Sequence, residues 1–277
     1  MQLVTSELYR TATGVVTGAD GQVLLVDPGV LPGELAALAA ELGGSGRRVA
    51  AAVATHAHWD HVLWAEALGP APRYATETTV RLLASQRERL VEEPMRAWSD
   101  EHYSDFDVAA AGRLTAAPAG VIPWPGPGVR LVPAGGHCPG HAGVVVEPDG
   151  VLFAGDMLSD LELPWPDWEL EQDPLAAYRR GLDALAAVPG VELVVPGHGG
   201  PGDAAELRRR VDADRGYLDA LEAAVSPLAE AGVVDEAAAV AAAGQVDDPR
   251  LRGWPPMAWL HAHNARGLLA SLGRAVA

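Results

Sequence analysis

Short apolar runs that end in turn residues recur along the first two-thirds of the chain. The segment from Tyr9 to Asp27 alternates β-prone runs around Asp20-Gly21 and closes on Pro28-Gly29, which predicts an opening hairpin. Apolar residues then recur at helical spacing from Gly33 to Leu42, and a further apolar run covers Val49 to Ala54. These patterns predict a helix that leads into a buried strand.

A histidine-rich turn follows that strand. The sequence HAHWDH covers His56 to His61, and the VLWAEALG that follows has helical periodicity and a glycine stop at Gly69. A short strand over Arg73 to Ala75 and a helix over Thr78 to Leu90 are expected next. The pattern therefore places the histidine cluster at a strand-to-helix turn.

Regularity fades between residues 94 and 127, where aromatic residues stand among prolines and glycines. The aromatic residues argue against a disordered tract. We predict an irregular insertion over about 94–127, which either forms a lid or packs over the edge of a sheet.

The second half of the chain repeats this alternation of strand and helix. Strands are predicted over Val129 to Val132, Val144 to Glu147, Val151 to Ala154 and Val191 to Val195. Helices are predicted over Leu175 to Val188, from Asp203 to about Val225, and from Asp235 onward with an interruption at Trp254-Pro255-Pro256. We expect a single domain over 1–277 with a helical C-terminal extension from about residue 203.

Charge narrows the range of partners. The chain has 37 acidic and 20 basic residues, a formal net charge of -17, and every basic residue is an arginine. The lack of lysine excludes Schiff-base chemistry and the phosphate-binding P-loop. Because nucleic acids and anionic lipids need clustered positive charge, we expect neither as a partner and predict a small-molecule substrate.

Cysteine content and hydropathy bear on the compartment. Cys138 is the one cysteine, so an intramolecular disulfide is impossible, and a small buried hydrophobe is its simplest role. The first residues lack the basic and apolar regions of a signal peptide, and no stretch approaches about 18 strongly apolar residues. We therefore expect a cytoplasmic protein without a membrane segment.

Four potential metal ligands stand within six residues. His56 and His58 can both turn inward from a loop, while Asp60 and His61 begin the next turn and face a neighbouring point. A lone histidine is usually an ordinary surface or core residue, but imidazoles and carboxylates in such density are typical of open catalytic zinc sites. This loop alone can serve two adjacent ions.

The motif resembles a known signature. HAHWDH is similar to the HxHxDH motif of the metallo-β-lactamase superfamily, and four further superfamily motifs follow in the expected order. They are Asp27 before Pro-Gly, His137 in GGHCPGH, Asp156 in FAGDM and His198 in VVPGHG. Each stands at the end of an apolar run, and together they span Asp27 to His198.

The resemblance implies a fold and a ligand set. The fold would be an α/β four-layer αββα sandwich with two central mixed sheets and the site at their shared edge. One divalent ion would be held by His56, His58 and His137, the other by Asp60, His61 and His198, and Asp156 would bridge them. Asp27 would support the loop without binding metal, and His141 would act by hydrogen bonding from behind the ligands or serve a purely structural role. We expect two zinc ions, with iron or manganese as alternatives.

The chemistry expected of such a site is hydrolysis. A bridging carboxylate and water would bring two ions to about 3.5–4 Å and supply a hydroxide nucleophile near neutral pH. Asp60 could also orient that nucleophile and shuttle its proton. Trp59, Trp165 and Trp168 are candidate pocket residues, although the last two could equally pack against their own loop.

Several reactions share this core. A small ester, lactone or thioester fits the acidic chain best. The alternatives are a persulfide dioxygenase with one iron, the phosphodiesterase and nuclease branch, and a β-lactamase. Glyoxalase II is similar in its HWDH sequence, but its substrate site uses lysine, which this chain lacks.

Overall fold

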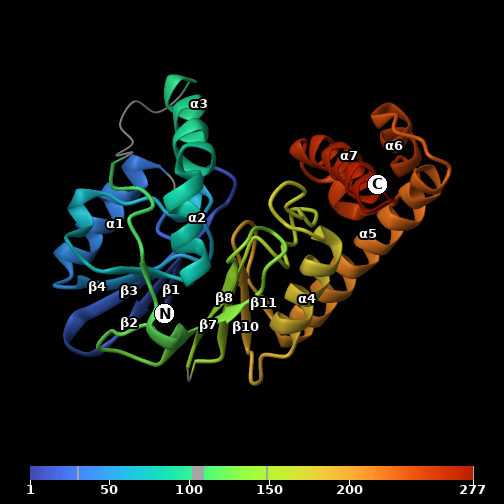
Figure 1. The fold of residues 1–277 in the computed structure, drawn as a ribbon. Helices are drawn as coiled ribbons and strands as arrows, with labels where there is room; N and C mark the ends of the chain where they lie inside the picture. Colours follow the sequence, from blue (N-terminus) through green and yellow to red (C-terminus); the bar gives the residue numbers. More distant parts are fainter. Residues whose placement is uncertain (30, 102–108, 148, 277) are drawn as a thin grey trace.

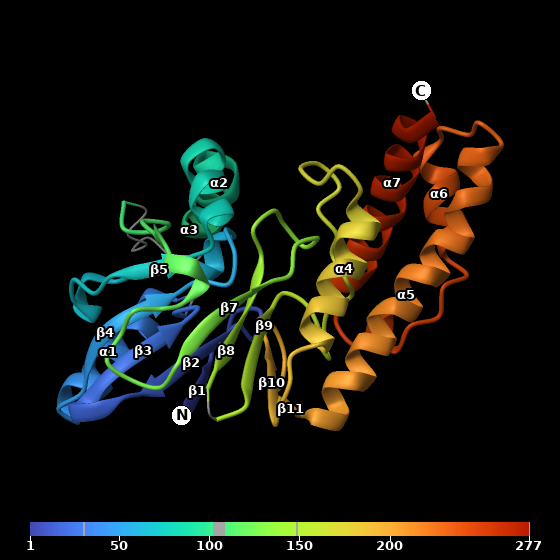
Figure 2. The same cartoon turned by 60° about the horizontal axis from the view of Figure 1, so that its bottom comes forward.

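Two β-sheets face each other in the middle of the molecule, and helices cover the outer face of each (Figure 1, Figure 2). This computed structural model describes residues 1–29, 31–101, 109–147 and 149–276. The predicted αββα sandwich with two central mixed sheets is confirmed.

The first sheet has its strands in the order of the chain. They are β1 (Gln2–Thr5), β2 (Ala12–Thr17), β3 (Gln22–Val26), β4 (Arg48–Val53), β5 (Arg73–Ala75) and β6 (Thr115–Ala116). Pairing is antiparallel from β1 to β3 and parallel from β3 to β6. Along β3, Val23 and Leu25 pack toward the helices, while Leu24 and Val26 pack toward the second sheet. Because both faces are buried, the strand is apolar throughout.

The predicted opening hairpin is confirmed. β2 pairs antiparallel with β3, and a short turn, η1 (Ala19–Gly21), joins them. Asp20 and Gly21 have φ values of 53° and 71°. Such left-handed values suit an Asp-Gly pair, which explains why this dipeptide marks the turn.

The second sheet has the spatial order β11-β10-β9-β8-β7. Its strands are β7 (Val129–Pro133), β8 (Ala142–Val146), β9 (Val151–Gly155), β10 (Leu193–Pro196) and β11 (Gly202–Asp203). Only the pairing of β9 with β10 is parallel among these strands. Val144 and Phe153 pack with Val16 and Val53 of the first sheet in the apolar layer between the sheets.

Helices of the first half cover the first sheet. They are α1 (Pro32–Gly44), α2 (Glu77–Arg87) and α3 (Glu93–Glu101), with a π-helical turn, η4 (Glu88–Glu92), joining α2 to α3. The Thr76 side chain accepts a hydrogen bond from the Thr79 N–H and so caps α2. Leu35, Leu38 and Leu83 are buried in the layer between these helices and the sheet.

Two helices of the second half, α4 (Pro174–Ala186) and α5 (Ala204–Glu230), cover the second sheet (Figure 1). The remaining elements pack with α5 away from the sheet: α6 (Glu236–Ala243), the 3-10 turn η6 (Pro249–Arg252) and α7 (Pro256–Val276). Leu182, Leu218 and Leu268 are almost completely buried in this layer. Among the described helices, none is both long and apolar enough to cross a membrane.

The prediction of a helix over the VLWAEALG segment is wrong. The chain there forms two 3-10 turns, η2 (Trp59–His61) and η3 (Glu66–Leu68), with an irregular stretch between them. Val62, Leu63 and Trp64 are all buried. Three consecutive buried side chains point in different directions around a helix, so tertiary packing overrides the local periodicity here.

Regular structure also extends further than the sequence predicted. β1 precedes the hairpin, and α3 continues to Glu101 in the segment that was expected to be irregular from Pro94. The C-terminal part of that segment is loop-like, with β6 and a 3-10 turn, η5 (Pro118–Gly120). Residues 102–108 lie outside the described residues, and a lid over 94–127 stays a prediction.

Candidate functional site

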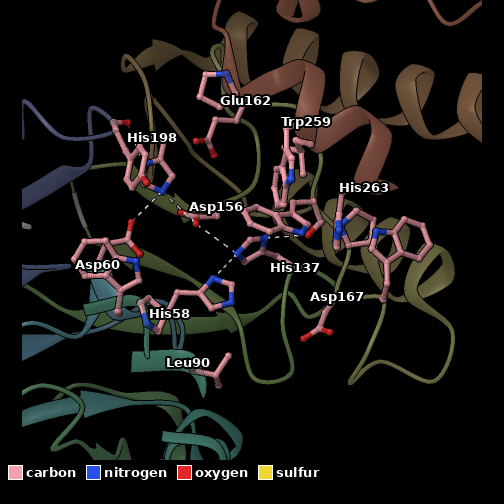
Figure 3. Close-up of a pocket in the computed structure, with 18 of the residues that line it drawn as sticks. His58, Asp60, Leu90, His137, Asp156, Glu162, Asp167, His198, Trp259 and His263 are labelled. Carbon is pink, nitrogen blue, oxygen red and sulfur yellow. Dashed lines mark hydrogen bonds and ion pairs between the residues drawn. The ribbon is translucent and has the colours of Figure 1, made fainter. Parts of the chain in front are cut away.

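The polar side chains gather where strands of both sheets end. His56 to His61 follow β4, Asp156 follows β9, and His198 follows β10. His137 lies in the loop between β7 and β8. All the ligand candidates predicted from the sequence therefore meet at one edge of the sandwich. Figure 3 shows five of them, His58, Asp60, His137, Asp156 and His198.

The first cluster holds three imidazoles and one carboxylate. Ligand atoms of His56, His58, His137 and Asp156 all lie within 4.8 Å of one another. The Nδ1 atom of His58 is 3.1 Å from Nε2 of His56 and 3.0 Å from Nε2 of His137. Three ring nitrogens thus converge on one point, as lone pairs do around a cation.

The second cluster consists of Asp60, His61 and His198. Oδ2 of Asp60 is 3.4 Å from Nε2 of His61 and 3.3 Å from Nε2 of His198. Asp156 contacts both clusters: its Oδ1 is 3.1 Å from His61 Nε2, and its Oδ2 is 3.4 Å from Nε2 of His56. This carboxylate lies where a bridging ligand would stand.

Backbone and side-chain oxygens hold the imidazoles from behind. Nδ1 of His137 is 3.0 Å from the Trp165 carbonyl oxygen, and Nδ1 of His198 is 3.1 Å from that of Tyr9. A carbonyl oxygen can only accept, so each Nδ1 carries a proton, and Nε2 is the ring nitrogen that faces the site and would bind a cation through its lone pair. The tautomer that a metal ion needs is therefore fixed by the fold.

Asp27 supports the cluster from outside it. Its Oδ2 is 2.9 Å from Nδ1 of His61, and its carboxylate also accepts hydrogen bonds from the N–H and hydroxyl of Thr55. The residue has a φ of 46°, a left-handed value that turns the chain at the end of β3. Asp27 thus contacts a ligand candidate and is in neither cluster, as the resemblance implies.

His141 lies beside the clusters and belongs to neither. Its Nδ1–H donates to the Ala134 carbonyl at 2.8 Å, and its ring centre is 5.2 Å from that of His56. A Cβ added to Gly155 would stand 2.3 Å from its Nε2. The His141 ring therefore lies beside the His56 ring. Because a Cβ at position 155 would clash with His141, that position requires glycine.

The charges of the two clusters balance each other. Burial lowers the pKa of His56 and of His137 well below the usual range, which keeps both rings neutral. Burial also opposes charge on Asp156, but His198 and His61 outweigh it and hold the pKa of that carboxyl well below its usual range. Burial opposes protonation of these two imidazoles as well, yet Asp156 raises the pKa of each well above its ordinary value. The protons on His61 and His198 thus balance the negative charge of carboxylates such as Asp156. Divalent cations bound to the clusters would displace those protons and balance the charge instead.

The residues fit a pair of divalent cations. Nε2 of His61 and Oδ1 of Asp156 are buried and only 3.1 Å apart, yet they are not aligned for a hydrogen bond, and neither atom has another hydrogen-bond partner among the described residues. Unsatisfied buried donors and acceptors are costly unless an ion completes them. A set of five imidazoles and two carboxylates is the donor chemistry that zinc and comparable transition metals prefer.

A pocket of about 600 Å³ opens over the clusters. The predicted pocket residues Trp59, Trp165 and Trp168 all line it. Trp168 is also buried, and it donates through Nε1 to Asn264 on α7. Its side chain thus packs against the C-terminal helix, whereas the alternative expected packing against its own loop.

From the sequence, the tryptophan loop and the C-terminal helices are expected to line the pocket, and His261 and His263 are candidates for its rim. The lining also includes Tyr9, Arg89, Glu162, Trp254 and Trp259, which sequence reasoning did not single out and which come from segments far apart in the chain. No local motif marks these residues. His261, in contrast, is buried between the Tyr217 hydroxyl and the Ala243 carbonyl, so of the histidine pair on α7 only His263 reaches the pocket.

Known proteins share the fold and the segment that carries the clusters. The family model described as the metallo-beta-lactamase superfamily matches residues 8–198. A metallo-beta-lactamase family protein from Thermus thermophilus is similar at 23% identity and a TM-score of 0.62, over 97% of this chain and 91% of that one. A beta-lactamase domain protein from Burkholderia ambifaria has 20% identity and a TM-score of 0.63, over 94% and 80%. A protein solved in a di-iron-bound form has 24% identity and a TM-score of 0.56, over 76% and 98%. No curated protein sequence matches the chain.

Proposed function

The chain belongs to the metallo-β-lactamase superfamily, and on that premise we propose that it is a dinuclear metal hydrolase of a small ester, lactone or thioester. The observation that carries this proposal is the convergence of seven candidate ligands in two adjacent clusters with Asp156 between them. A fold retained only for binding would not need to keep all seven.

The proposed roles follow from the contacts of each side chain. His56, His58 and His137 hold one cation, Asp60, His61 and His198 hold the other, and Asp156 contacts both sets. Two cations held there would lower the pKa of a bound water toward neutrality and polarise the substrate carbonyl. Asp60, whose buried carboxylate lines the pocket, would also orient that water and take up its proton.

The pocket favours a small uncharged substrate over a nucleic acid. Five carboxylates line it, and Arg89 is the single arginine among the lining residues that the structure describes; the carboxylates are Asp60, Asp156, Glu162, Asp167 and Glu169. A polyanionic backbone needs several cationic contacts. We therefore place phosphodiesters behind carboxylic esters, lactones and thioesters as substrates.

The metals are proposed to be zinc, with iron and manganese as alternatives. Histidine and carboxylate ligands accept all three ions, so ligand type alone does not choose among them. Of the two alternatives to zinc, iron is favoured over manganese, because one similar protein was solved in a di-iron-bound form.

Elemental analysis of protein purified without added metal, paired with a substrate panel, tests the proposal. The panel contains carboxylic esters, lactones, thioesters, phosphodiesters and a chromogenic cephalosporin. We expect about two equivalents of divalent metal and cleavage of one carboxylic class. One equivalent of iron with an inert panel would instead favour a persulfide dioxygenase.

A matched pair of variants links the metal to the clusters. His58→Ala removes a ligand candidate and should lower both metal content and turnover. His261→Ala removes a buried imidazole that lies in neither cluster, so its metal content should stay at the wild-type level. Equal metal content in both variants would contradict the assignment of His58.

A further inference from the structure

Three aromatic rings form a continuous surface along one side of the pocket, which we call the aromatic wall: Trp165, Trp259 and His263. The Trp259 and His263 rings stack at an interplanar angle of 13° with centres 5.2 Å apart. Trp165 meets both rings edge-on, at 5.7 Å from Trp259 and 5.9 Å from His263. These are the favoured geometries of aromatic pairs, so the wall is a preformed surface.

The wall begins at a proposed metal ligand. The Trp165 carbonyl accepts the hydrogen bond from His137 Nδ1, and its ring centre is 6.3 Å from that of His137. Figure 3 shows Trp259 and His263 on the side of the pocket that adjoins His137. A substrate whose reacting bond lies over the clusters can therefore extend directly along the wall.

Packing alone does not account for two of these rings. Trp259 is 56% exposed and Trp165 is 36% exposed, although a large apolar side chain gains stability from burial. Trp168, on the same loop as Trp165, is 5% exposed and has its N–H bonded to Asn264. The loop thus buries one tryptophan for structure and presents the other to the pocket.

The charges around the wall disfavour an anionic ligand. Asp167 and Glu169 line the pocket beside it, and Glu162 lies on the side of the clusters. Arg89 forms an ion pair with Glu169 through its Nη1 atom, so the carboxylate of Glu169 offsets the charge of this guanidinium. Burial lowers the pKa of His263, so this ring is neutral at pH 7 and adds a π face without a charge.

We propose that the aromatic wall binds the non-reacting end of the substrate and that this end is an aryl group without negative charge. The inference rests on the proposed hydrolase function and names its substrate class. A flat ring can stack on the open face of the Trp259 and His263 pair while Trp165 contacts its edge. The neighbouring carboxylates then exclude acyl groups that end in a carboxylate.

Matched substrates measure this preference. For thioesters the set is S-ethyl thioacetate, its 2-phenyl derivative, the 4-carboxy form of that derivative, and S-benzyl thioacetate. Equivalent sets apply if the panel identifies esters or lactones. Released thiol can be followed with a thiol reagent, since the sole cysteine, Cys138, is completely buried. We expect one of the two neutral aryl substrates to exceed S-ethyl thioacetate in kcat/KM by roughly tenfold or more, and the carboxylated one to lose that advantage.

Variants assign the preference to the wall. Trp259→Ala should lower the ratio of aryl to non-aryl kcat/KM by roughly tenfold, whereas Trp259→Phe keeps a flat ring and most of the ratio. Val234→Ala is the control, since Val234 is an apolar residue that is 87% exposed and does not line the pocket. An unchanged ratio in Trp259→Ala would overturn the inference while leaving the hydrolase intact.

Binding without turnover separates this inference from the proposed function. Phenylacetamide and acetamide are titrated against the metal-loaded protein and against Trp259→Ala, with tryptophan fluorescence as the readout. Tighter binding of phenylacetamide that Trp259→Ala abolishes supports the wall even if every ester is inert, an outcome that would refute only the hydrolase. Equal affinity for the two amides would refute the wall.

Discussion

Arg250 joins the C-terminal helices to the loop that follows Asp156, and its removal should destabilise the protein strongly. Its guanidinium is 2.6 Å from Asp214 on α5 and 2.8 Å from Asp248, and it donates to the Glu162 carbonyl at 3.0 Å. The side chains of Arg250 and Asp214 are 8% and 2% exposed. Arg250→Met keeps the volume and leaves Asp214 as an uncompensated buried charge, which costs about 3–5 kcal/mol in the free energy of unfolding.

Arg179→Met is the matched control. Arg179 has equally short contacts, 2.6 Å to Asp219 and 2.7 Å to Glu222, but its side chain is 32% exposed. Solvent-exposed ion pairs contribute about 0–1 kcal/mol, so this variant should remain close to wild type. Denaturant unfolding of both variants gives the comparison. Equal losses would refute the argument that burial, rather than contact distance, determines the contribution of these ion pairs.

The same variant predicts a pH dependence. Burial raises the pKa of Asp214, and Arg250 opposes that rise, so Arg250→Met raises it further. A carboxyl whose folded pKa is above its unfolded value stabilises the fold when protonated and loses that contribution as pH rises. The deficit of Arg250→Met should therefore shrink in acid. A double variant, Arg250→Met with Asp214→Leu, should recover part of the loss because the more deeply buried of the two carboxylates that pair with Arg250 is removed, while Asp248 remains.

Three further predictions concern the site. A Cβ on Gly197 would stand 2.1 Å from Asp156 Oδ1, so Gly197→Ala should displace this carboxylate and lower the metal content measured by elemental analysis. Gly216→Ala is the control, because a Cβ on this residue of α5 would meet no atom within 4 Å and should leave the metal content unchanged. Asp27→Asn removes the negative charge behind His61 and replaces one of the two acceptor oxygens by an NH2 donor, so it should weaken metal affinity about 10–100-fold in a chelator competition, and wild-type affinity would contradict this. In metal-free protein, burial raises the pKa of Glu162 to about 7 from 4.5. Its contribution to stability is complete below pH 4.5 and is lost as pH rises through about 7, so Glu162→Gln should flatten that decline in denaturant unfolding; an identical slope would argue against it.

The ligand candidates could be found from sequence because each follows an apolar strand within a short motif. Recognising the preceding strand is enough to place these residues at one edge of the sandwich, as it is for His56 to His61, Asp156 and His198. The helix predicted after His61 failed for the opposite reason. Val62 to Trp64 are buried on several sides by residues distant in the chain, and periodicity records only local preference.

The pocket was harder to predict because no short segment builds it. Tyr9 precedes β2, Arg89 lies in the π-helical turn, and Trp259 and His263 belong to α7. Each looks like an ordinary surface residue in its own segment. Their shared function depends on how α7 packs against α5 and on the loop held by Arg250, neither of which leaves a pattern in the sequence.

The family match ends at residue 198, and the aromatic wall divides across that boundary. Trp165 lies inside the matched range beside His137, while Trp259 and His263 lie beyond it on α7. Asn264 of the same helix bonds Trp168 and the Pro164 carbonyl, so α7 also fixes the loop that carries Trp165. On the proposed function, membership of the superfamily would account for the two ligand clusters, and substrate choice would depend on the C-terminal helices. If that division is correct, substitutions on α7 change the ratio between substrates at constant metal content, whereas substitutions in the clusters change metal content for every substrate alike.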